Sequence, residues 1–259
     1  MINKLGVQLF TIRDFLKTED DIKRSFEKLR EIGYSEVQTA GMYPFISPQK
    51  FAQIANDNDI KIIGTHIPIG EIEENIDKIV EMHQAYDTVN VGIGAMPIAC
   101  GEEMTLEFVE AFISRFNKCA DKVSEYGFKL TYHNHDFDFL KHDGKCVMDR
   151  LIESFNENNT SFVIDTYWLQ AGGVSILEYM NKCAGRLDIL HLKDYKVIYK
   201  KPPIYTEIGN GNINFEDVVA CAEKIGVKHY IVEQDDCPGN PFDSLATSYN
   251  NLKEVGLLK

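Results

Sequence analysis

The sequence predicts an α/β protein folded as a single (β/α)8 barrel over residues 1–259. Short runs rich in β-branched and aromatic residues alternate with longer segments of helical periodicity, and such alternation indicates parallel strands joined by crossover helices. Eight strand–helix units in 259 residues amount to about 32 residues each, which suits the roughly 250-residue size of this barrel. A doubly wound open sheet is the competitor, but its GxGxxG phosphate loop is absent from the sequence.

The strands are expected where β-rich runs lie between turn-forming residues. In chain order they are Leu5–Thr11, Glu36–Ala40, Lys61–Ile67, Thr88–Ile93, Lys129–Asn134, Ser161–Thr166, Leu187–Asp194 and His229–Gln234. The clearest helical segments, with apolar residues three and four apart, are Asp20–Ile32, Ile72–Ala85 and Thr105–Tyr126. Gly33, Gly127 and Gly226 each follow a helical segment and precede a strand, where a left-handed helix-terminating residue belongs.

Composition and charge narrow the class of function. The chain carries 40 acidic and 27 Lys and Arg residues, a formal net charge of −13, which argues against nucleic acid and anionic membranes as partners and leaves a small molecule. The six cysteines form no CxxC pair, so neither a zinc cluster nor a dithiol site is indicated. No apolar run is long enough for a membrane span, and the first residues run directly into a strand, so a cytoplasmic protein is expected. The oligomeric state stays open, a homo-oligomer included.

The last four predicted strands end in polar side chains, and in such a barrel the active site lies at the carboxyl ends of the strands. Because side chains alternate along a strand, His133, Asp165, His191 and Glu233 all face the barrel mouth, as does Lys193. Each of these residues alone is equally well explained as a hydrogen-bonded core group. Their convergence from four adjacent strands instead favours one bound divalent ion, with Mn, Co, Zn, Fe and Mg as candidates.

Further residues are expected to line a substrate pocket at this mouth. His66 ends the third strand facing inward, and Gln8 lies on the first strand. Trp168 follows the sixth strand and offers an apolar wall to a sugar ring, although packing is an equally good explanation for it. His83, on a predicted helix, and His142, in a polar loop, are expected at the surface.

These motifs resemble the xylose isomerase-like TIM barrels, the sugar phosphate isomerase/epimerase group that also includes inosose dehydratases, ketose 3-epimerases and endonuclease IV. The resemblance covers essentially the whole chain and begins with the segment from Gly6 to Asp14. The other segments that carry it are Tyr132-His133-Asn134-His135, Asp165-Thr166-Tyr167-Trp168, His191-Leu192-Lys193-Asp194, Glu207-Ile208-Gly209-Asn210-Gly211, Val232-Glu233-Gln234-Asp235 and the helix Ser244–Leu252.

The resemblance implies a ligand set and two departures from it. The family holds its metal with Glu, Asp, His and Glu from strands five to eight, and this chain matches the last three with Asp165, His191 and Glu233. His133 stands where the epimerases have the first glutamate, and Trp168 stands where they tend to have a substrate-binding histidine. Glu207 is expected to bind substrate. Because classical epimerases use two glutamates on opposite faces of the sugar, the change at position 133 puts that mechanism in doubt here.

The first hypothesis is a metal-dependent sugar isomerase or epimerase that abstracts the proton next to a carbonyl through a metal-stabilised enediolate. Glu233 is the expected base, His133 or His135 handles a second proton, and Lys193 stabilises an oxyanion. The alternative is a lyase or dehydratase that eliminates a β-substituent from a keto-sugar or keto-inositol. An abasic-site endonuclease and a barrel that binds a sugar without turning it over are weaker hypotheses.

Overall fold

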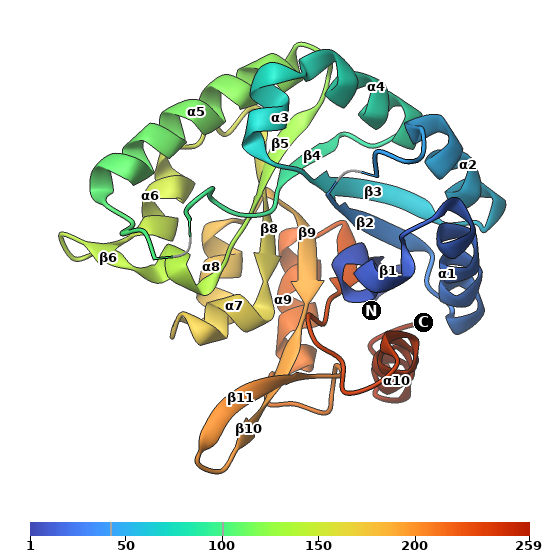
Figure 1. Ribbon diagram of the computed structural model, residues 1–259. Helices are drawn as coiled ribbons and strands as arrows, with labels where there is room; N and C mark the ends of the chain where they lie inside the picture. Colours follow the sequence, from blue (N-terminus) through green and yellow to red (C-terminus); the bar gives the residue numbers. More distant parts are fainter. Residues whose placement is uncertain (42, 100) are drawn as a thin grey trace.

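The computed structural model describes every residue of the chain except 42 and 100. Eight strands form one parallel sheet in the order β3-β2-β1-β12-β9-β8-β5-β4, which curls into a nearly closed barrel and confirms the expected fold class (Figure 1). The strands are β1 Leu5–Gln8, β2 Glu36–Ala40, β3 Lys61–His66, β4 Asn90–Ile93, β5 Lys129–His133, β8 Thr160–Asp165, β9 Leu187–Leu192 and β12 His229–Val232.

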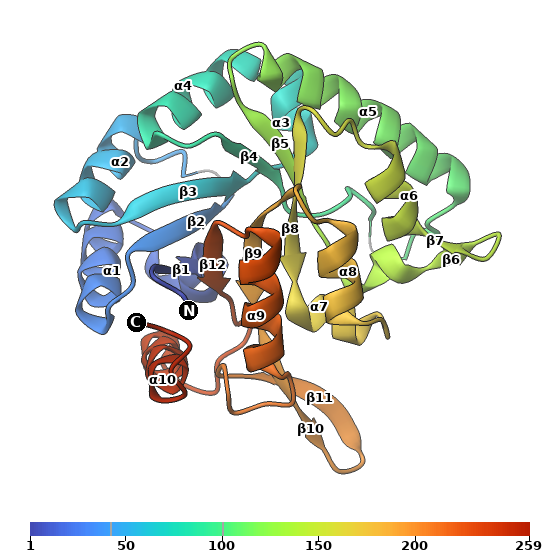
Figure 2. The same cartoon turned by 180° about the vertical axis from the view of Figure 1, so that it is seen from behind.

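Helices cover the outside of the barrel, as Figures 1 and 2 show from opposite sides. They are α1 Glu19–Ile32, α2 Pro48–Asp57, α3 Ile69–Glu74, α4 Ile76–Tyr86, α5 Leu106–Ser124, α6 Val147–Ser154, α7 Thr166–Ala171, α8 Ile176–Lys182, α9 Phe215–Ile225 and α10 Pro241–Glu254. Polar caps fix where helices begin: the side chains of Thr18, Ser47 and Thr105 each accept a hydrogen bond from a backbone N–H of the first turn. Among the described residues, none of these helices combines the length and apolarity needed to cross a membrane.

The barrel has a seam between β3 and β4, the two ends of the hydrogen-bonded strand order. The hydrogen bonds across it form no regular ladder: Asn90 Nδ2 donates to Ile63 O at 2.9 Å, Ile67 N donates to Gly92 O at 2.8 Å, and Gly92 N donates to Thr65 Oγ1 at 3.4 Å. The strands approach so closely that a Cβ on Gly92 would overlap the carbonyl oxygen of Thr65. Glycine at this position is what allows the barrel to come this near to closure.

Two hairpins and two short 3-10 helices are added to the barrel strands and α-helices, and none of them was expected from the sequence. The hairpins are β6 Lys141–His142 with β7 Lys145–Cys146, and β10 Asp194–Ile198 with β11 Lys201–Thr206. The β10–β11 hairpin projects from the barrel in both views (Figure 2). The 3-10 helices are η1 Leu9–Phe15 and η2 Asp136–Phe139.

Most expected boundaries shift by one or two residues, and three of the differences have clear local reasons. The first strand ends at Gln8 instead of Thr11, because the Gln8 side chain accepts from Phe10 N and caps η1. The expected strand Leu187–Asp194 ends at Leu192, and Asp194 already begins the hairpin. The expected helix Ile72–Ala85 is two helices, separated at Asn75, whose φ of −131° is not helical.

The surface assignment of His83 was wrong. Its side chain is fully buried between α4 and the barrel, where Nε2 lies 2.9 Å from Thr65 Oγ1 and Nδ1 lies 2.7 Å from Ile79 O. Thr65 therefore faces the helices while the adjacent His66 faces the barrel interior, as strand alternation requires. Inside the barrel, beneath the mouth, the side chains of Ile63, Val163, Ile189 and Ile231 form a separate small core.

Candidate active site

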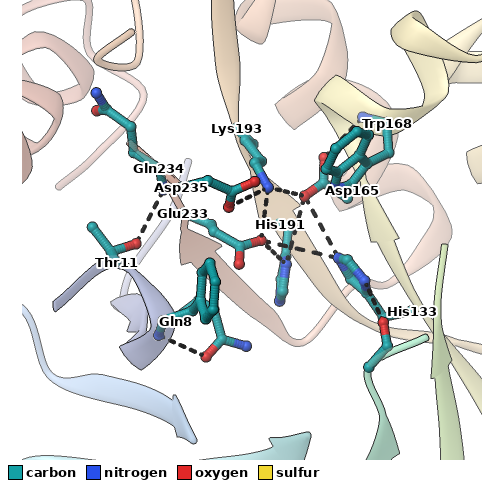
Figure 3. A network of polar contacts seen from close by, with 12 residues as sticks. Gln8, Thr11, His133, Asp165, Trp168, His191, Lys193, Glu233, Gln234 and Asp235 are labelled. Carbon is teal, nitrogen blue, oxygen red and sulfur yellow. Dashed lines mark hydrogen bonds and ion pairs between the residues drawn. The ribbon is translucent and has the colours of Figure 1, made fainter. Parts of the chain in front are cut away.

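Four buried side chains meet at the carboxyl ends of neighbouring strands, as the sequence predicted. His133 ends β5, Asp165 ends β8, His191 lies on β9, and Glu233 directly follows β12. Each residue offers one ligand atom, and these atoms all lie within 4.8 Å of one another (Figure 3). We call these four residues the quartet.

The quartet is oriented by hydrogen bonds made with its outward-facing atoms. Nδ1 of His133 lies 3.0 Å from the carbonyl oxygen of Gly94, and Oδ1 of Asp165 accepts from Trp168 N at 3.0 Å. Nε2 of His191 lies 2.6 Å from Oε1 of Gln38. Partners of this kind fix the rotamer and tautomer of metal ligands and leave the opposite ring nitrogen or oxygen for the ion.

Two of the four inward-facing atoms, by contrast, lack a hydrogen-bond partner among the described residues. Nε2 of His133 and Oδ2 of Asp165 are buried, have no hydrogen bond among the described residues, and lie 3.6 Å apart. Nδ1 of His191 lies 2.9 Å from Oε2 of Glu233. Two imidazole nitrogens and two carboxylate oxygens form a donor set that suits divalent transition metals, so the quartet can hold such an ion.

Lys193 adds a buried ammonium group beside the quartet. Its Nζ lies 2.7 Å from Oδ1 of Asp235, 3.5 Å from Oε2 of Glu233 and 3.7 Å from Oδ2 of Asp165. Burial by itself would lower the pKa of Lys193, but the three carboxylates outweigh burial and raise it. Lys193 therefore stays protonated at neutral pH, and Asp235 holds it at the edge of the quartet.

The two carboxylates of the quartet are ionised. Burial opposes this, but the Lys193 ammonium and the neighbouring histidines prevail, so that the pKa of Glu233 falls to about 2 and that of Asp165 lies well below its usual range. Burial likewise opposes a charge on His191, yet the Glu233 and Asp165 carboxylates raise its pKa. The site thus favours positive charge at its centre, which a divalent ion would supply.

A cavity of about 500 Å³ opens above the quartet. Two quartet members, His133 and Glu233, line it, and the residues proposed from sequence that also line it are Gln8, His66, His135, Trp168 and Lys193. Several of these side chains have polar atoms without a hydrogen-bond partner among the described residues: His66 Nε2, His135 Nδ1 and Trp168 Nε1. Such buried, unpaired atoms can bind the hydroxyl and carbonyl groups of a ligand.

The two cavity histidines outside the quartet are neutral at physiological pH. Burial and the nearby His133 lower the pKa of His135 to about 3, and burial lowers the pKa of His66 well below its ordinary value. Nδ1 of His66 lies 3.3 Å from Nε2 of Gln8, which also donates to Oε1 of Gln38 at 3.1 Å. The polar side chains of Gln8, Gln38 and His66 are therefore linked by continuous polar contacts at the floor of the cavity.

The structure does not bring Glu207 to the cavity. Its carboxylate accepts hydrogen bonds from Ser244 Oγ at 2.8 Å, Thr206 Oγ1 at 3.1 Å and Asn210 Nδ2 at 3.2 Å. These contacts join the end of β11 to the start of α10. Glu207 thus lies where it fixes the loop that follows the hairpin.

Three groups that contribute to the site were not predicted from the sequence. Gln38 faces inward on β2, and strand alternation could have identified it, since Glu36 and Gln38 share one face of that strand. Asp235 lies beyond the end of β12, where alternation no longer applies. The third contributor is the carbonyl oxygen of Gly94, a backbone atom that no side-chain pattern in the sequence could indicate.

Comparisons with known proteins point to one family. A model of the xylose isomerase-like TIM barrel family matches residues 26–254. An inosose dehydratase from Geobacillus thermodenitrificans is 26% identical over 168 residues, which are 58% of this chain and 56% of that protein. The chain therefore spans about half the length of the curated relatives that it matches.

Solved structures show the same fold at low identity. A sugar phosphate isomerase/epimerase from Parabacteroides distasonis has a TM-score of 0.82 at 18% identity, over 100% of this chain and 96% of that chain. A D-allulose 3-epimerase from Methylomonas sp. has a TM-score of 0.72 at 11% identity, over 97% of each chain. At these identities the solved structures show the fold alone, and they include proteins named as an epimerase, a dehydratase and an AP endonuclease, so the fold leaves the reaction open.

Proposed function

The chain belongs to the xylose isomerase-like TIM barrel family, and from that premise we propose that it is a metal-dependent lyase acting on a keto-sugar or keto-cyclitol. The reaction removes the proton on the carbon next to the carbonyl and then expels an oxygen substituent from the following carbon. A divalent ion held by the quartet supplies, when bound, positive charge that stabilises the negative charge developing on the substrate oxygen. Mn, Co, Zn, Fe and Mg remain candidates for this ion.

One observation favours elimination over epimerisation: the cavity offers a single carboxylate that is free to act as a base. Of the described residues lining it, only Glu233 and Asp235 are carboxylates, and Asp235 is paired with Lys193 at 2.7 Å. Oε2 of Glu233 faces the histidines of the quartet, whereas its Oε1 has no hydrogen-bond partner among the described residues. Elimination needs one base, whereas epimerisation by two carboxylates needs a second one that this cavity lacks among those residues.

The remaining cavity residues position the substrate and its charge. Glu233 accepts the proton, and its low pKa keeps it ionised throughout the neutral range. The Lys193 ammonium donates a hydrogen bond to an oxygen that gains negative charge. Trp168 Nε1 and His66 Nε2 lie buried, have no hydrogen-bond partner in the described part of the chain, and bind hydroxyl groups of the substrate.

A sugar isomerase or epimerase is the second candidate, and His135 is the residue that favours it. Its Nδ1 lines the same cavity without a partner, and its ring lies 4.8 Å from that of His133. Because His135 is neutral, it would relay a proton from water through its ring, in place of the glutamate that two-carboxylate epimerases use. The inosose dehydratase relatives, which match by sequence, support the lyase instead.

Incubation of metal-loaded protein with an inosose and with a keto-glucose in D2O tests both candidates. The lyase predicts loss of water from the substrate, and an epimerase predicts deuterium in a recovered sugar of altered configuration, both resolved by mass spectrometry and NMR. Glu233→Gln is expected to abolish either outcome while keeping the fold. Glu207→Gln is the matched control, because that carboxylate lies outside the cavity lining. A Glu233→Gln variant with near wild-type turnover would refute the assignment of the base.

Metal content gives a test that does not depend on the substrate. Native mass spectrometry is expected to find about one divalent ion per chain in the wild type and none in His191→Ala, since His191 is the ligand tied most closely to the rest of the quartet. If neither protein takes up an ion after addition of Mn, Co or Zn, the proposed metal-dependent reaction is wrong.

A further inference from the structure

The β10–β11 hairpin exposes large apolar side chains together. It projects from the barrel beyond the end of β9 (Figures 1 and 2). Val197 is 62% exposed, Tyr199 is 83% exposed and Ile204 is 47% exposed, and none of the three belongs to the hydrophobic core of the described residues. A two-stranded hairpin is marginally stable by itself in water, and grouped exposed apolar side chains mark a contact surface.

The base of the hairpin is fixed to the barrel, so that its outer half has a defined position. Tyr195 and Tyr205 lie opposite each other at the base, and their ring centroids lie 5.7 and 4.7 Å from that of Tyr167 on α7. Asn212 adds two hydrogen bonds: its Oδ1 accepts from Val197 N at 2.9 Å, and its N donates to Tyr195 O at 2.8 Å. We call the outer half, residues 196–204, the arm.

Both edges of the hairpin are closed to an added strand. On the β10 edge, Asn212 already uses the N–H of Val197 and the carbonyl oxygen of Tyr195. On β11, Pro202 and Pro203 have no N–H group, and because neighbouring residues direct their N–H groups to opposite sides, one of the two removes a donor from the outer edge. A partner of the arm must therefore contact its side chains and not its backbone.

The charge of the arm is opposite to that of the body. The arm carries Lys196, Lys200 and Lys201 and no acidic residue. Without these three lysines the chain has 24 Lys and Arg residues against 40 acidic ones, a net charge of −16. A basic, apolar arm on an acidic body complements the body of a second copy of the same chain, whereas an anionic membrane or nucleic acid would be repelled by that body.

A second cavity lies beside the barrel mouth and offers an acidic, partly apolar acceptor. It has a volume of about 260 Å³ and lies between η1 and the loop that precedes α10. We call it the rim pocket. Phe15, which is 39% exposed, contributes an aromatic ring to its wall. The charged residues among the described ones that line it are Asp14, Asp235, Asp236 and Arg13.

Two of these carboxylates are available to a partner. The side chains of Asp14 and Asp236 are 76% and 83% exposed. Asp14 lies 3.3 Å from Nζ of Lys17, and Asp236 lies 3.8 Å from the guanidinium of Arg13. Exposed ion pairs of this kind contribute little, so incoming lysines can replace them. Arg13 is held in place by hydrogen bonds to backbone carbonyl oxygens.

The arm and the rim pocket lie on the same end of the barrel. The arm follows β9, and the rim pocket is built by the segments after β12 and β1, which are the next strands in the barrel order. A twofold dimer requires this arrangement, since each copy must both give and receive the contact on one face. Reciprocal exchange also doubles the buried area, which matters because stable interfaces bury about 1,200–2,000 Å² and a single arm is small.

We propose that the protein forms a twofold dimer in which the arm of each copy inserts into the rim pocket of the other. The ring of Tyr199 packs against Phe15 of the second copy, and Lys200 and Lys201 face its exposed carboxylates Asp14 and Asp236. This inference goes beyond the proposed reaction and does not depend on it.

Charge-swapped variants give the main test. One variant carries Lys200→Glu with Lys201→Glu, and the other carries Asp14→Lys with Asp236→Lys. Sedimentation velocity is expected to find a dimeric wild type and each variant alone as a folded monomer, because like charges then meet at both contacts of its dimer. An equimolar mixture of the two variants is expected to form a dimer with one copy of each, identified by mass in native mass spectrometry, since both of its contacts again join opposite charges.

A second pair of variants tests the apolar contact. Tyr199→Ser is expected to raise the dissociation constant of the dimer at least about 10-fold, since a buried aromatic side chain commonly dominates such an interface. Tyr126→Ser is the matched control, because Tyr126 is 47% exposed and precedes β5, at the opposite end of the barrel. A dimer that is unaffected by Tyr199→Ser would overturn the placement of this ring.

The other outcomes of the charge test each overturn a stated part of the proposal. A wild type that stays monomeric up to about 100 μM would overturn the dimer. A dimer that survives Asp14→Lys with Asp236→Lys would mean that the arm contacts another surface, and folded monomeric variants that do not combine would likewise refute the rim pocket. Species that keep growing with concentration would show a head-to-tail contact in place of reciprocal exchange. Thermal unfolding confirms that each variant is folded.

Discussion

Gln38 on β2 and His191 on β9 lie 2.6 Å apart, measured from the amide oxygen of Gln38 to Nε2 of His191, across the interior of the barrel. Because an amide oxygen can only accept a hydrogen bond, Nε2 of His191 carries the proton. Nδ1 is therefore the ring nitrogen that faces the quartet, 2.9 Å from Oε2 of Glu233. Gln38 thus selects the tautomer of His191 that can bind an ion.

Gln38→Leu should weaken metal binding without removing a ligand. Loss of a partner of this kind typically lowers affinity about 10- to 100-fold, and competition with a chelating dye measures it. Thr39→Val is the matched control, since Thr39 is the next residue of the same strand and its Oγ1 makes no hydrogen bond among the described residues. Unchanged affinity in Gln38→Leu would show that His191 needs no such support.

Lys193→Met is expected to destabilise the metal-free protein and to increase the stabilisation that metal provides. The substitution leaves the buried carboxylates of Asp165, Glu233 and Asp235 without their nearest cation, which costs about 3–5 kcal/mol in the free energy of unfolding. A divalent ion should restore part of that loss. Thermal unfolding with and without Mn measures both effects, and the exposed Lys196→Met is the control. Equal metal-induced shifts in the two proteins would contradict the prediction.

His83 should make the stability of the fold depend on acid pH. Burial lowers the pKa of His83 from its ordinary value near 6.5 to about 4. The unfolded chain therefore binds a proton that the folded chain refuses between these pH values, so stability is complete above pH 6.5 and falls as the pH drops toward 4. The loss is on the order of 3 kcal/mol.

Denaturant unfolding at a series of pH values checks this behaviour. The advantage of the wild type over His83→Gln should shrink steadily from pH 6.5 to pH 4. The same substitution at His142, half-exposed in the β6–β7 hairpin, controls for the exchange of imidazole for amide. A stability difference that stays constant across this range would mean that His83 protonates as readily in the folded chain as in the unfolded one.

Gly92→Ala should be one of the more damaging small substitutions in the barrel. The added methyl group would overlap the carbonyl oxygen of Thr65 at the seam, and overpacking of this kind costs about 1–3 kcal/mol or more. Gly70→Ala is the control, because no atom lies within 4 Å of a Cβ built there. Chemical denaturation compares the two, and equal stabilities would show that β3 and β4 separate easily.

The quartet was predictable because strand alternation and strand ends are local properties of the sequence. Once the eight parallel strands were placed, the inward positions of His133, Asp165, His191 and Glu233 followed from periodicity alone. The same periodicity also fixed His66, which lines the cavity.

What the sequence could not show depends on contacts between distant segments. The burial of His83 needs the partner Thr65, which lies on a strand 18 residues earlier, and helical periodicity does not reveal it. Glu207 was expected at the substrate because of its motif, but hydrogen bonds from Ser244 and Asn210 hold it away from the cavity lining. The apolar part of the cavity lining, which includes Phe10, Ile67 and Ala95, emerges only when the ends of β1, β3 and β4 are seen together.

The seam between β3 and β4 sets where the barrel opens first. The amide groups of Asn90 and Gly92 donate only to hydroxyl oxygens among the described residues, at 3.5 and 3.4 Å. Their protons should therefore exchange with deuterated water sooner than those between β5 and β8, which an uninterrupted ladder protects. The seam interrupts the wall on the side of Ile67 and Ala95. Local opening of the barrel would therefore widen the cavity mouth beside Ile67 and Ala95.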